Sequence, residues 1–220
     1  KQNTLGRKQK AVTNTQHLSQ GELQKAACCN LSESFETNPS IDVNFSDAVT
    51  GNKQIKMLGL TSPYILMSEE NIPAIRGALQ ATGLNFIPGT WAESIQITKG
   101  AGSVVNGYES IAGQINVELK KPETAEKLLA NIYVNDFGKT DLNLNLSHKL
   151  NSKWATSLLL HDDFLNNNNI DFNKDEFRDL PTGNQLSLVN RFNYNNANGF
   201  LSQFGYKILN DQKIGGQTTF

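Results

Sequence analysis

The sequence has no long hydrophobic run and little excess charge. Its aliphatic runs, such as Leu158–Leu160, are far shorter than the roughly 20 apolar residues of a membrane-spanning helix. Only the strands of a closed barrel could therefore carry this chain across a bilayer. The 20 basic and 21 acidic residues leave a net charge of −1. Without a basic patch, we expect no nucleic-acid partner.

Cysteine is almost absent. Cys28 and Cys29 are the only two, and adjacent cysteines rarely form an unstrained disulfide. We therefore interpret them as small buried side chains on a helix. A soft-metal site would need further ligands, and His17 is the only candidate nearby in the sequence.

Histidine is also scarce, and the three histidines form no catalytic pattern. His148 and His161 fall in predicted strands and have no obvious triad partner. Asp162 and Asp163 form a charge pair at a strand end that we expect to be solvated. We therefore predict that the protein is not an enzyme and has no catalytic residues, no cofactor and no metal ligands.

The first half of the sequence predicts a small mixed α/β domain. Residues 1–17 are polar and are expected to be weakly structured. A capping box between Ser19 and Glu22 predicts a helix that runs to about Cys29, and a second, short helix should end near Asn38. Short strands are expected at residues 40–45, 54–60, 64–69, 95–98 and 114–119, and a loop at residues 70–89.

After Pro122 the pattern changes to alternation. Residues 128–209 contain five segments with an apolar residue at every second position. In the second segment, Leu142, Leu144 and Leu146 alternate with polar residues. A period of two predicts strands with one apolar and one polar face.

The connections between these segments alternate in length. Residues 150–153 and 195–199 are tight turns, whereas residues 163–183 form a long polar loop. Short turns on one side and long loops on the other are typical of a transmembrane β-barrel, but a soluble sheet with one wet face shows the same alternation of residues. The polar face is rich in Asn, Ser and Gln, which favours the barrel. So do aromatic residues near strand ends, namely Trp154, Tyr194 and Phe200.

Four glycines lie between the strands predicted at residues 95–98 and 114–119, namely Gly100, Gly102, Gly107 and Gly113. Glycine-rich connections often bind a phosphate or form a tight turn. Here no helix start and no Lys-Ser/Thr pair follows the glycines. We therefore expect neither a nucleotide-binding loop nor a hairpin.

The sequence around these glycines resembles the end of the plug domain of TonB-dependent outer-membrane receptors. The resemblance rests on ESIQITKG at residues 93–100 and NGYESIAGQINV at residues 106–117, with Gln114 where the family usually has a second glycine. Upstream, QIKMLGL at residues 54–60 is similar to another family strand, with Leu58 in place of an arginine. The resemblance covers about residues 5–122.

The resemblance implies an α+β plug domain at residues 1–122. Residues 123–220 would then be the antiparallel β-strands that begin a large transmembrane β-barrel, with about five strands present. Both ends of the sequence look cut, so we expect a fragment of a longer protein. The implied partners are TonB, through a missing N-terminal segment, outer-membrane lipid and an imported ligand. The implied location is the bacterial outer membrane.

The resemblance further implies a receptor that imports a scarce large solute, such as a siderophore, cobalamin or a metal complex. The alternatives are a glycan importer of the same fold and a non-transporting adhesin or scaffold. Glycan importers of the family often have an aspartate after the lysine that corresponds to Lys99. Here Gly100 follows it, which favours the first expectation.

Three plug turns are expected to face the ligand, at residues 46–52, 61–64 and 85–91, on a unit whose outer surface should be polar. Tyr64 and Trp91 are the expected main contacts, because aromatic side chains supply a large contact area at small entropic cost. The full set of candidate substrate-binding residues is Ser46, Asn52, Thr61, Ser62, Tyr64, Asn85 and Trp91.

Overall fold

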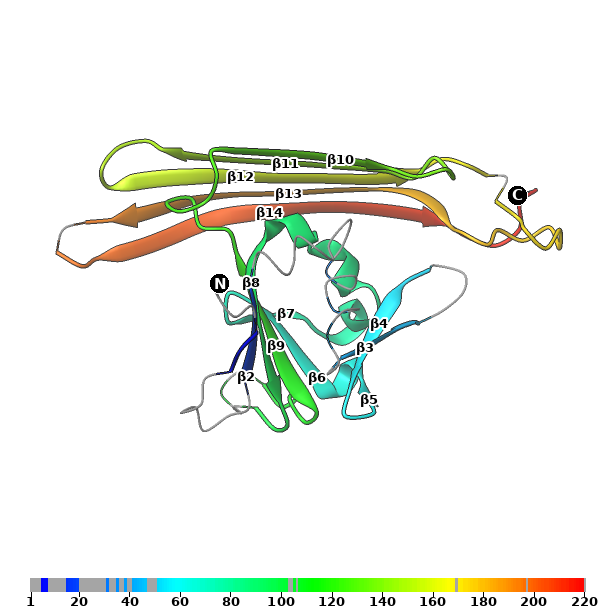
Figure 1. Ribbon diagram of the computed structural model, residues 1–220, viewed down its shortest axis with the longest axis horizontal. Helices are drawn as coiled ribbons and strands as arrows, with labels where there is room; N and C mark the ends of the chain where they lie inside the picture. The colour runs from blue at the N-terminus through cyan, green and yellow to red at the C-terminus, as the bar shows by residue number, and fades with distance from the viewer. Residues whose placement is uncertain are drawn as a thin grey trace. The chain divides into compact units, whose positions relative to one another are not determined.

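The chain forms two compact units, whose elements are drawn in Figure 1. The first unit takes in residues up to 47 and residues 52–119, and the second takes in residues 48–51 and those from 120 onward. The computed structural model describes residues 5–7, 15–19, 31, 35, 38, 41–46, 51–102, 105, 107–168, 170–196 and 198–219. Within these ranges, no helix has the length and apolar character needed to cross a membrane.

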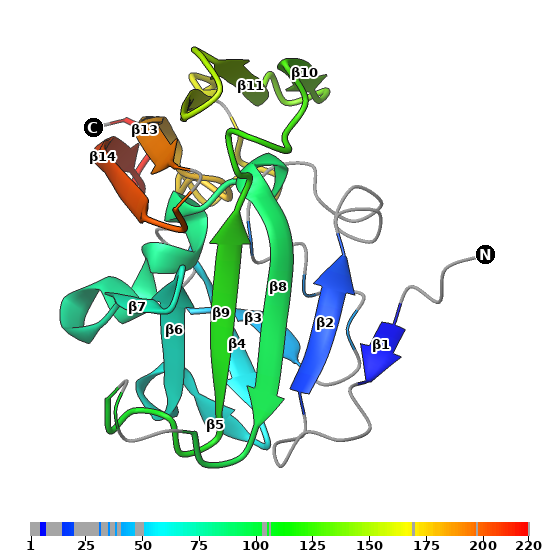
Figure 2. The same cartoon turned by 90° about the vertical axis from the view of Figure 1, so that its left-hand side faces the viewer.

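The first unit contains a six-stranded sheet, seen face on in Figure 2. Its strands lie in the order β1 (Leu5–Arg7), β2 (Thr15–Ser19), β8 (Ala92–Lys99), β9 (Gly113–Leu119), β6 (Ile65–Glu69) and β7 (Ile72–Ile75). β9 pairs antiparallel with β8 and parallel with β6. The two strands predicted around the glycine-rich segment are therefore neighbours in the centre of this sheet.

The pairing of β8 with β9 corrects one expectation from the sequence. Residues 100–112 join two adjacent antiparallel strands, so they form a long hairpin connection. The pairing aligns apolar side chains, with Ile95 opposite Val117 and Ile97 opposite Ile115. All four are fully buried. Burial of these aligned pairs stabilises the hairpin despite its long loop.

A second, three-stranded sheet completes the first unit, with the order β3 (Asp42–Phe45), β4 (Lys53–Met57) and β5 (Leu60–Thr61). The strand predicted at residues 40–45 corresponds to β3, whereas the one predicted at residues 54–60 is divided by a turn at Leu58 and Gly59, where both residues have positive φ. The loop predicted at residues 70–89 is wrong, because it contains β7 and several 3-10 turns. The short helices are η1 (Ser62–Tyr64), η2 (Gly77–Ala81), η3 (Gly83–Phe86) and η4 (Gly89–Trp91). β7 tolerates Pro73 because it is an edge strand of its sheet.

The N-terminal region is more ordered than its polar sequence predicts. Residues 1–17 were expected to be weakly structured, but β1 and most of β2 lie within them. β2 adds to the edge of β8, with Leu18 opposite Ile95, so backbone pairing rather than apolar alternation forms it. Ser19, the predicted helix cap, ends β2, and the predicted helix that follows lies outside the described residues. Leu31 and Phe35 are helical and Asn38 is not, as expected for a short helix that ends there.

The surface of the first unit is not uniformly polar, contrary to expectation. Several large apolar side chains are more than half exposed on its turns and edges. They are Phe45, Leu58, Ile72, Val105, Tyr108 and Ile111. They lie in turns or at strand ends, and singly exposed apolar side chains are normal on protein surfaces.

The second unit is a five-stranded antiparallel sheet whose strands follow chain order. They are β10 (Leu128–Val134), β11 (Thr140–Lys149), β12 (Trp154–Leu165), β13 (Thr182–Asn195) and β14 (Leu201–Ile214). This confirms the antiparallel strands predicted at residues 128–209, and β14 extends beyond the predicted end. Each strand neighbours the next, because the alternating pattern and short turns favour a meander.

The two faces of this sheet have the opposite burial to that of a soluble sheet. On β11, the polar side chains of Asp141, Asn143 and Asn145 are buried. Between them, Leu144 is half-buried and Leu146 is exposed. The same inversion continues on β13, where Ser187 is buried and Leu186 is exposed. In β11–β13 the polar face is therefore the buried one, and the apolar face is half-buried or exposed.

Candidate functional site

Three of the seven predicted contact residues lie together in the first unit. The Oγ atom of Ser46 donates a hydrogen bond of 2.9 Å to the carbonyl oxygen of Asn52. The side-chain amide of Asn85 donates one of 2.7 Å to Oδ1 of Asn52. The structure thus links two of the predicted ligand-facing turns, at residues 46–52 and 85–91, through Asn52.

Thr61, Ser62 and Tyr64 occupy the third predicted turn, where β5 leads through η1 into β6. The carbonyl oxygen of Tyr64 accepts hydrogen bonds from the backbone amides of Ile111 and Ala112, at 3.1 and 2.9 Å. This turn therefore adjoins the glycine-rich connection. The Tyr64 side chain is 44% exposed, so its ring is accessible to a ligand in this conformation.

Trp91 lies elsewhere, in the core of the first unit. Its side chain has no exposed surface, and its indole nitrogen is buried with no hydrogen-bond partner among the described residues. Contact between Trp91 and a ligand would therefore require the unit to rearrange. Of the two aromatic residues predicted as contacts, Tyr64 alone is exposed.

An ion pair braces the glycine-rich connection, and sequence reasoning missed it. The Arg76 guanidinium lies 2.6 Å from Oε1 of Glu109. Arg76 is half exposed, whereas Glu109 is buried. Gly107 between them has φ of +137°, and a Cβ atom there would collide with the Glu109 carboxylate and lie 3.1 Å from Nη2 of Arg76. The backbone conformation therefore favours glycine at position 107, and a larger residue would also displace the Glu109 carboxylate.

The charge on Glu109 is favoured by its neighbours. Burial acts to raise the pKa of this carboxyl. Hydrogen bonds from its own backbone amide and from Arg76, together with the Arg76 charge, lower the pKa by more than burial raises it. The net pKa lies below the usual value of 4.5. Glu109 is therefore ionised at neutral pH, and the pair joins the segment between β7 and η2 to residues 100–112 by a charged contact.

Aromatic rings gather at the end of the second unit that carries the short turns. The ring centroid of Trp154 lies 4.9 Å from that of Tyr194 and 6.1 Å from that of Phe204. Tyr194 in turn contacts Phe200, and Phe192 stacks on Phe204. These contacts include all three aromatic residues that the sequence placed near strand ends. Amphipathic rings of this kind concentrate at the interface between lipid and water.

Comparison with known proteins identifies the first unit. The family model described as TonB-dependent Receptor Plug Domain matches residues 7–114. The vitamin B12 transporter BtuB of Vibrio vulnificus (strain CMCP6) is 25% identical over 115 residues. That match covers 52% of this chain and 19% of BtuB, so the matched part is about a fifth of the relative's length.

Solved structures of low sequence identity share the fold of both units. The siderophore receptor PiuA from Acinetobacter baumannii superposes with a TM-score of 0.68 at 13% identity, over 90% of this chain and 26% of PiuA. The ferric-catecholate import receptor Fiu from E. coli K12, in its open form, also gives 0.68 at 13% identity, over 92% of this chain and 28% of Fiu. Through the plug domain at residues 7–114, which an antiparallel sheet with the fold of these structures follows, this chain belongs to the TonB-dependent receptors.

Proposed function

We propose that the protein imports a scarce large solute across the outer membrane, of the class of siderophores, cobalamin or metal complexes. The similarity to a vitamin B12 transporter over 52% of the chain supports this class. Residues 1–122 then serve as the plug, and residues 123–220 form the first part of the barrel wall. No covalent chemistry is required, because import needs only binding of the solute and a path for it through the barrel.

The observation that carries the proposal is the inverted burial of β11–β13, the three central strands of the sheet. A sheet with Leu144 and Leu146 outward and Asn143 and Asn145 enclosed suits a wall between lipid and a wet interior. In a soluble protein, the exposed leucines would be a costly apolar patch. Lipid in contact with this face removes that cost, and the aromatic cluster around Trp154 then lies at the membrane interface.

Ligand binding is assigned to the turns of the plug. The Ser46, Asn52 and Asn85 side chains offer hydrogen-bonding groups in two linked turns. Tyr64, in the third turn, offers an exposed aromatic ring. Thr61 and Ser62 complete the polar set on the third turn, and Trp91 joins it only after rearrangement. An exposed aromatic ring together with polar side chains on the plug turns suits a large, partly polar solute.

Opening of the path requires the plug to change shape, and its polar contacts suit that change. Elements joined by hydrogen bonds and ion pairs, such as Arg76 with Glu109, open locally at less cost than a large apolar core. We propose that TonB supplies the pulling force through a segment N-terminal to this chain. The force would act on the plug, while the wall strands remain paired.

An uptake experiment tests this function. The receptor is expressed in a Gram-negative strain without its own cobalamin and siderophore receptors, and the accumulation of radiolabelled cobalamin and of ferric siderophores is measured with and without TonB. We expect one class of solute to accumulate only when TonB is present. Binding without TonB-dependent accumulation, or no binding by any solute in the panel, would contradict the proposal.

A further inference from the structure

A histidine and two aspartates converge on the enclosed face of the second unit. Ligand atoms of Asp141, His161 and Asp163 all lie within 4.8 Å of one another. Asp141 and His161 are buried, and Asp163 is half-buried. We propose that these three residues form a binding site for a divalent first-row transition-metal ion.

The strand register brings these residues together. Asp141 on β11 lies directly opposite Asp163 on β12, and Asn143 lies directly opposite His161. Because side chains two residues apart on a strand share a face, Asp163 and His161 point to the same side as Asp141 and Asn143. Direct and diagonal neighbours on a sheet face are within reach of each other's side chains. One small ion could therefore be reached by all three ligands.

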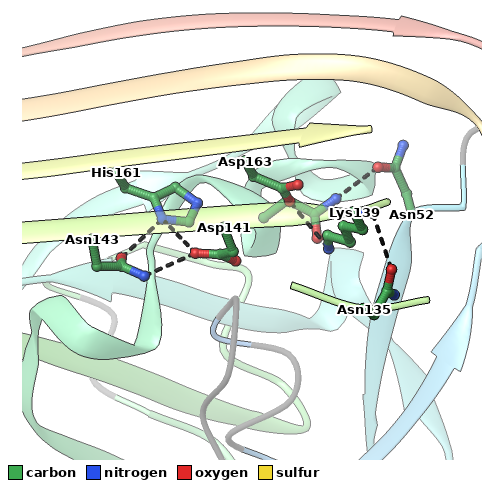
Figure 3. Close-up of polar contacts among 8 residues, drawn as sticks. Asn52, Asn135, Lys139, Asp141, Asn143, His161 and Asp163 are labelled. Carbon is green, nitrogen blue, oxygen red and sulfur yellow. Dashed lines mark hydrogen bonds and ion pairs between the residues drawn. The ribbon is translucent and has the colours of Figure 1, made fainter. Parts of the chain in front are cut away.

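Hydrogen bonds already orient the ligands, as Figure 3 shows. Nδ1 of His161 lies 2.9 Å from Oδ1 of Asn143 and 3.4 Å from Oδ1 of Asp141. The side-chain amide of Asn143 donates a hydrogen bond of 2.8 Å to the same oxygen of Asp141. A neighbour that fixes both a histidine and a carboxylate is the usual support of a metal site.

A buried hydroxyl next to this cluster is a second, independent sign of a ligand. Ser187 on β13 lies directly opposite His161, on the same face of the sheet. Its side chain has no exposed surface, and its Oγ atom has no hydrogen-bond partner among the described residues. A buried hydroxyl without a partner is unfavourable. A metal ion, or a water bound to it, would satisfy Ser187.

The charges around the cluster also call for a cation. Two carboxylates in directly opposed positions repel each other. Lys139 offsets part of this repulsion, since its Nζ atom lies 3.2 Å from Oδ2 of Asp163. Lys139 and a metal ion would therefore compete for the Asp163 carboxylate. One imidazole with two carboxylates suits Zn²⁺, Cu²⁺ or Ni²⁺, and Cu²⁺ should bind most tightly of these.

Titration of the purified metal-free receptor with Cu²⁺ alone tests the site, by calorimetry and by electron paramagnetic resonance. We expect the spectrum of bound Cu²⁺ to show coordination by one imidazole nitrogen. His161→Gln should abolish this signal. Asp163→Asn should weaken binding at least tenfold. Asp162→Asn is the matched control, because Asp162 is adjacent in sequence but on the opposite face of β12, and it should leave the affinity unchanged. His148→Gln is a second control, at the other histidine of the sheet.

Lys139→Gln distinguishes a metal site from a purely structural cluster. Removal of the competing ammonium group should increase Cu²⁺ affinity severalfold, whereas a structural role predicts no gain. The proposal is overturned if His161→Gln binds Cu²⁺ with the wild-type spectrum, or if Asp162→Asn and Asp163→Asn weaken binding equally. Folding of each variant is checked by gel electrophoresis in detergent without heating, in which a folded receptor resists unfolding. Metal binding is measured without transport. The absence of a metal site would therefore leave the import proposal standing, and the absence of import would leave the metal site standing.

Discussion

Arg76 and Glu109 are separated by 33 residues, yet their side chains meet at 2.6 Å. The pair joins the end of β7 to the glycine-rich connection between β8 and β9. The described part of the first unit thus contains a charged contact between a half-exposed guanidinium and a buried carboxylate. Such a contact stabilises the closed plug while remaining weaker than apolar packing.

Glu109→Gln should weaken this region of the plug. The substitution keeps the volume of the side chain but removes its charge, and hydrogen bonds to charged groups contribute about 1.5–3 kcal/mol. We expect amides of β8 and β9 to exchange with deuterium roughly tenfold faster or more, measured by mass spectrometry on the receptor. Glu93→Gln, at a half-buried position of β8, is the control. Equal exchange in both variants would show that the ion pair contributes nothing.

The same pair should make the plug sensitive to acid. The pKa of Glu109 is lower in the folded protein than its usual value of 4.5, so its contribution to stability is complete above the unfolded pKa. The contribution is lost as the pH falls through the lower, folded pKa. Exchange rates of β8 and β9, corrected for the intrinsic pH effect, should therefore rise below about pH 4.5. This extra rise should be absent in Glu109→Gln, and its persistence there would assign it to another group.

Gly107→Ala should be more harmful than alanine at another glycine of positive φ. Gly59 has φ of +79°, and a Cβ atom there would meet nothing within 4 Å, so Gly59→Ala adds only backbone strain. That strain costs about 1 kcal/mol or more. Gly107→Ala adds strain and also pushes on the Arg76–Glu109 pair. Gly107→Ala should therefore lose more exchange protection than Gly59→Ala, through its less tolerated φ of +137° and the contact together. No difference would mean that the pair moves aside freely.

Tyr64→Ala and Trp91→Ala should separate a ligand contact from a core residue. Loss of the exposed Tyr64 ring should weaken solute binding while exchange protection of the plug stays close to wild type. Loss of the buried Trp91 side chain should destabilise the plug by about 3–5 kcal/mol through the cavity it leaves. Solute affinity and amide exchange measured on the same samples decide this. Unchanged affinity in Tyr64→Ala would remove Tyr64 from the binding set.

The strands of the second unit could be predicted because their chemistry repeats. Leu142, Leu144 and Leu146 alternate with polar residues over a whole strand, so one pattern fixes both element and face. The contact between Asp141 and Asp163 also follows from the sequence once the tight turn at residues 150–153 sets the register of β11 and β12. Without that register, Asp163 resembles any solvated charge at a strand end, which is how it was interpreted.

Contacts of the first unit were less accessible to prediction. β1 and β2 carry no strong apolar alternation; β2 forms because β8 offers an edge to pair with, and β1 pairs with β2 in turn. The contact between Arg76 and Glu109 depends on the path of residues 100–112, which no short-range pattern specifies. The burial of Trp91 follows from how η4 packs, not from the residue type. Tertiary pairing therefore decided each of these features.

The central claim is that the sheet of β10–β14 is part of a membrane wall with its leucine face toward lipid. Spin labels at Leu144→Cys and Asn143→Cys, adjacent residues on opposite faces of β11, test it in the receptor reconstituted into lipid vesicles. We predict that collisions with oxygen, which concentrates in lipid, are frequent at position 144 and rare at position 143. Equal oxygen accessibility at the two positions, or greater accessibility at position 143, would contradict the claim.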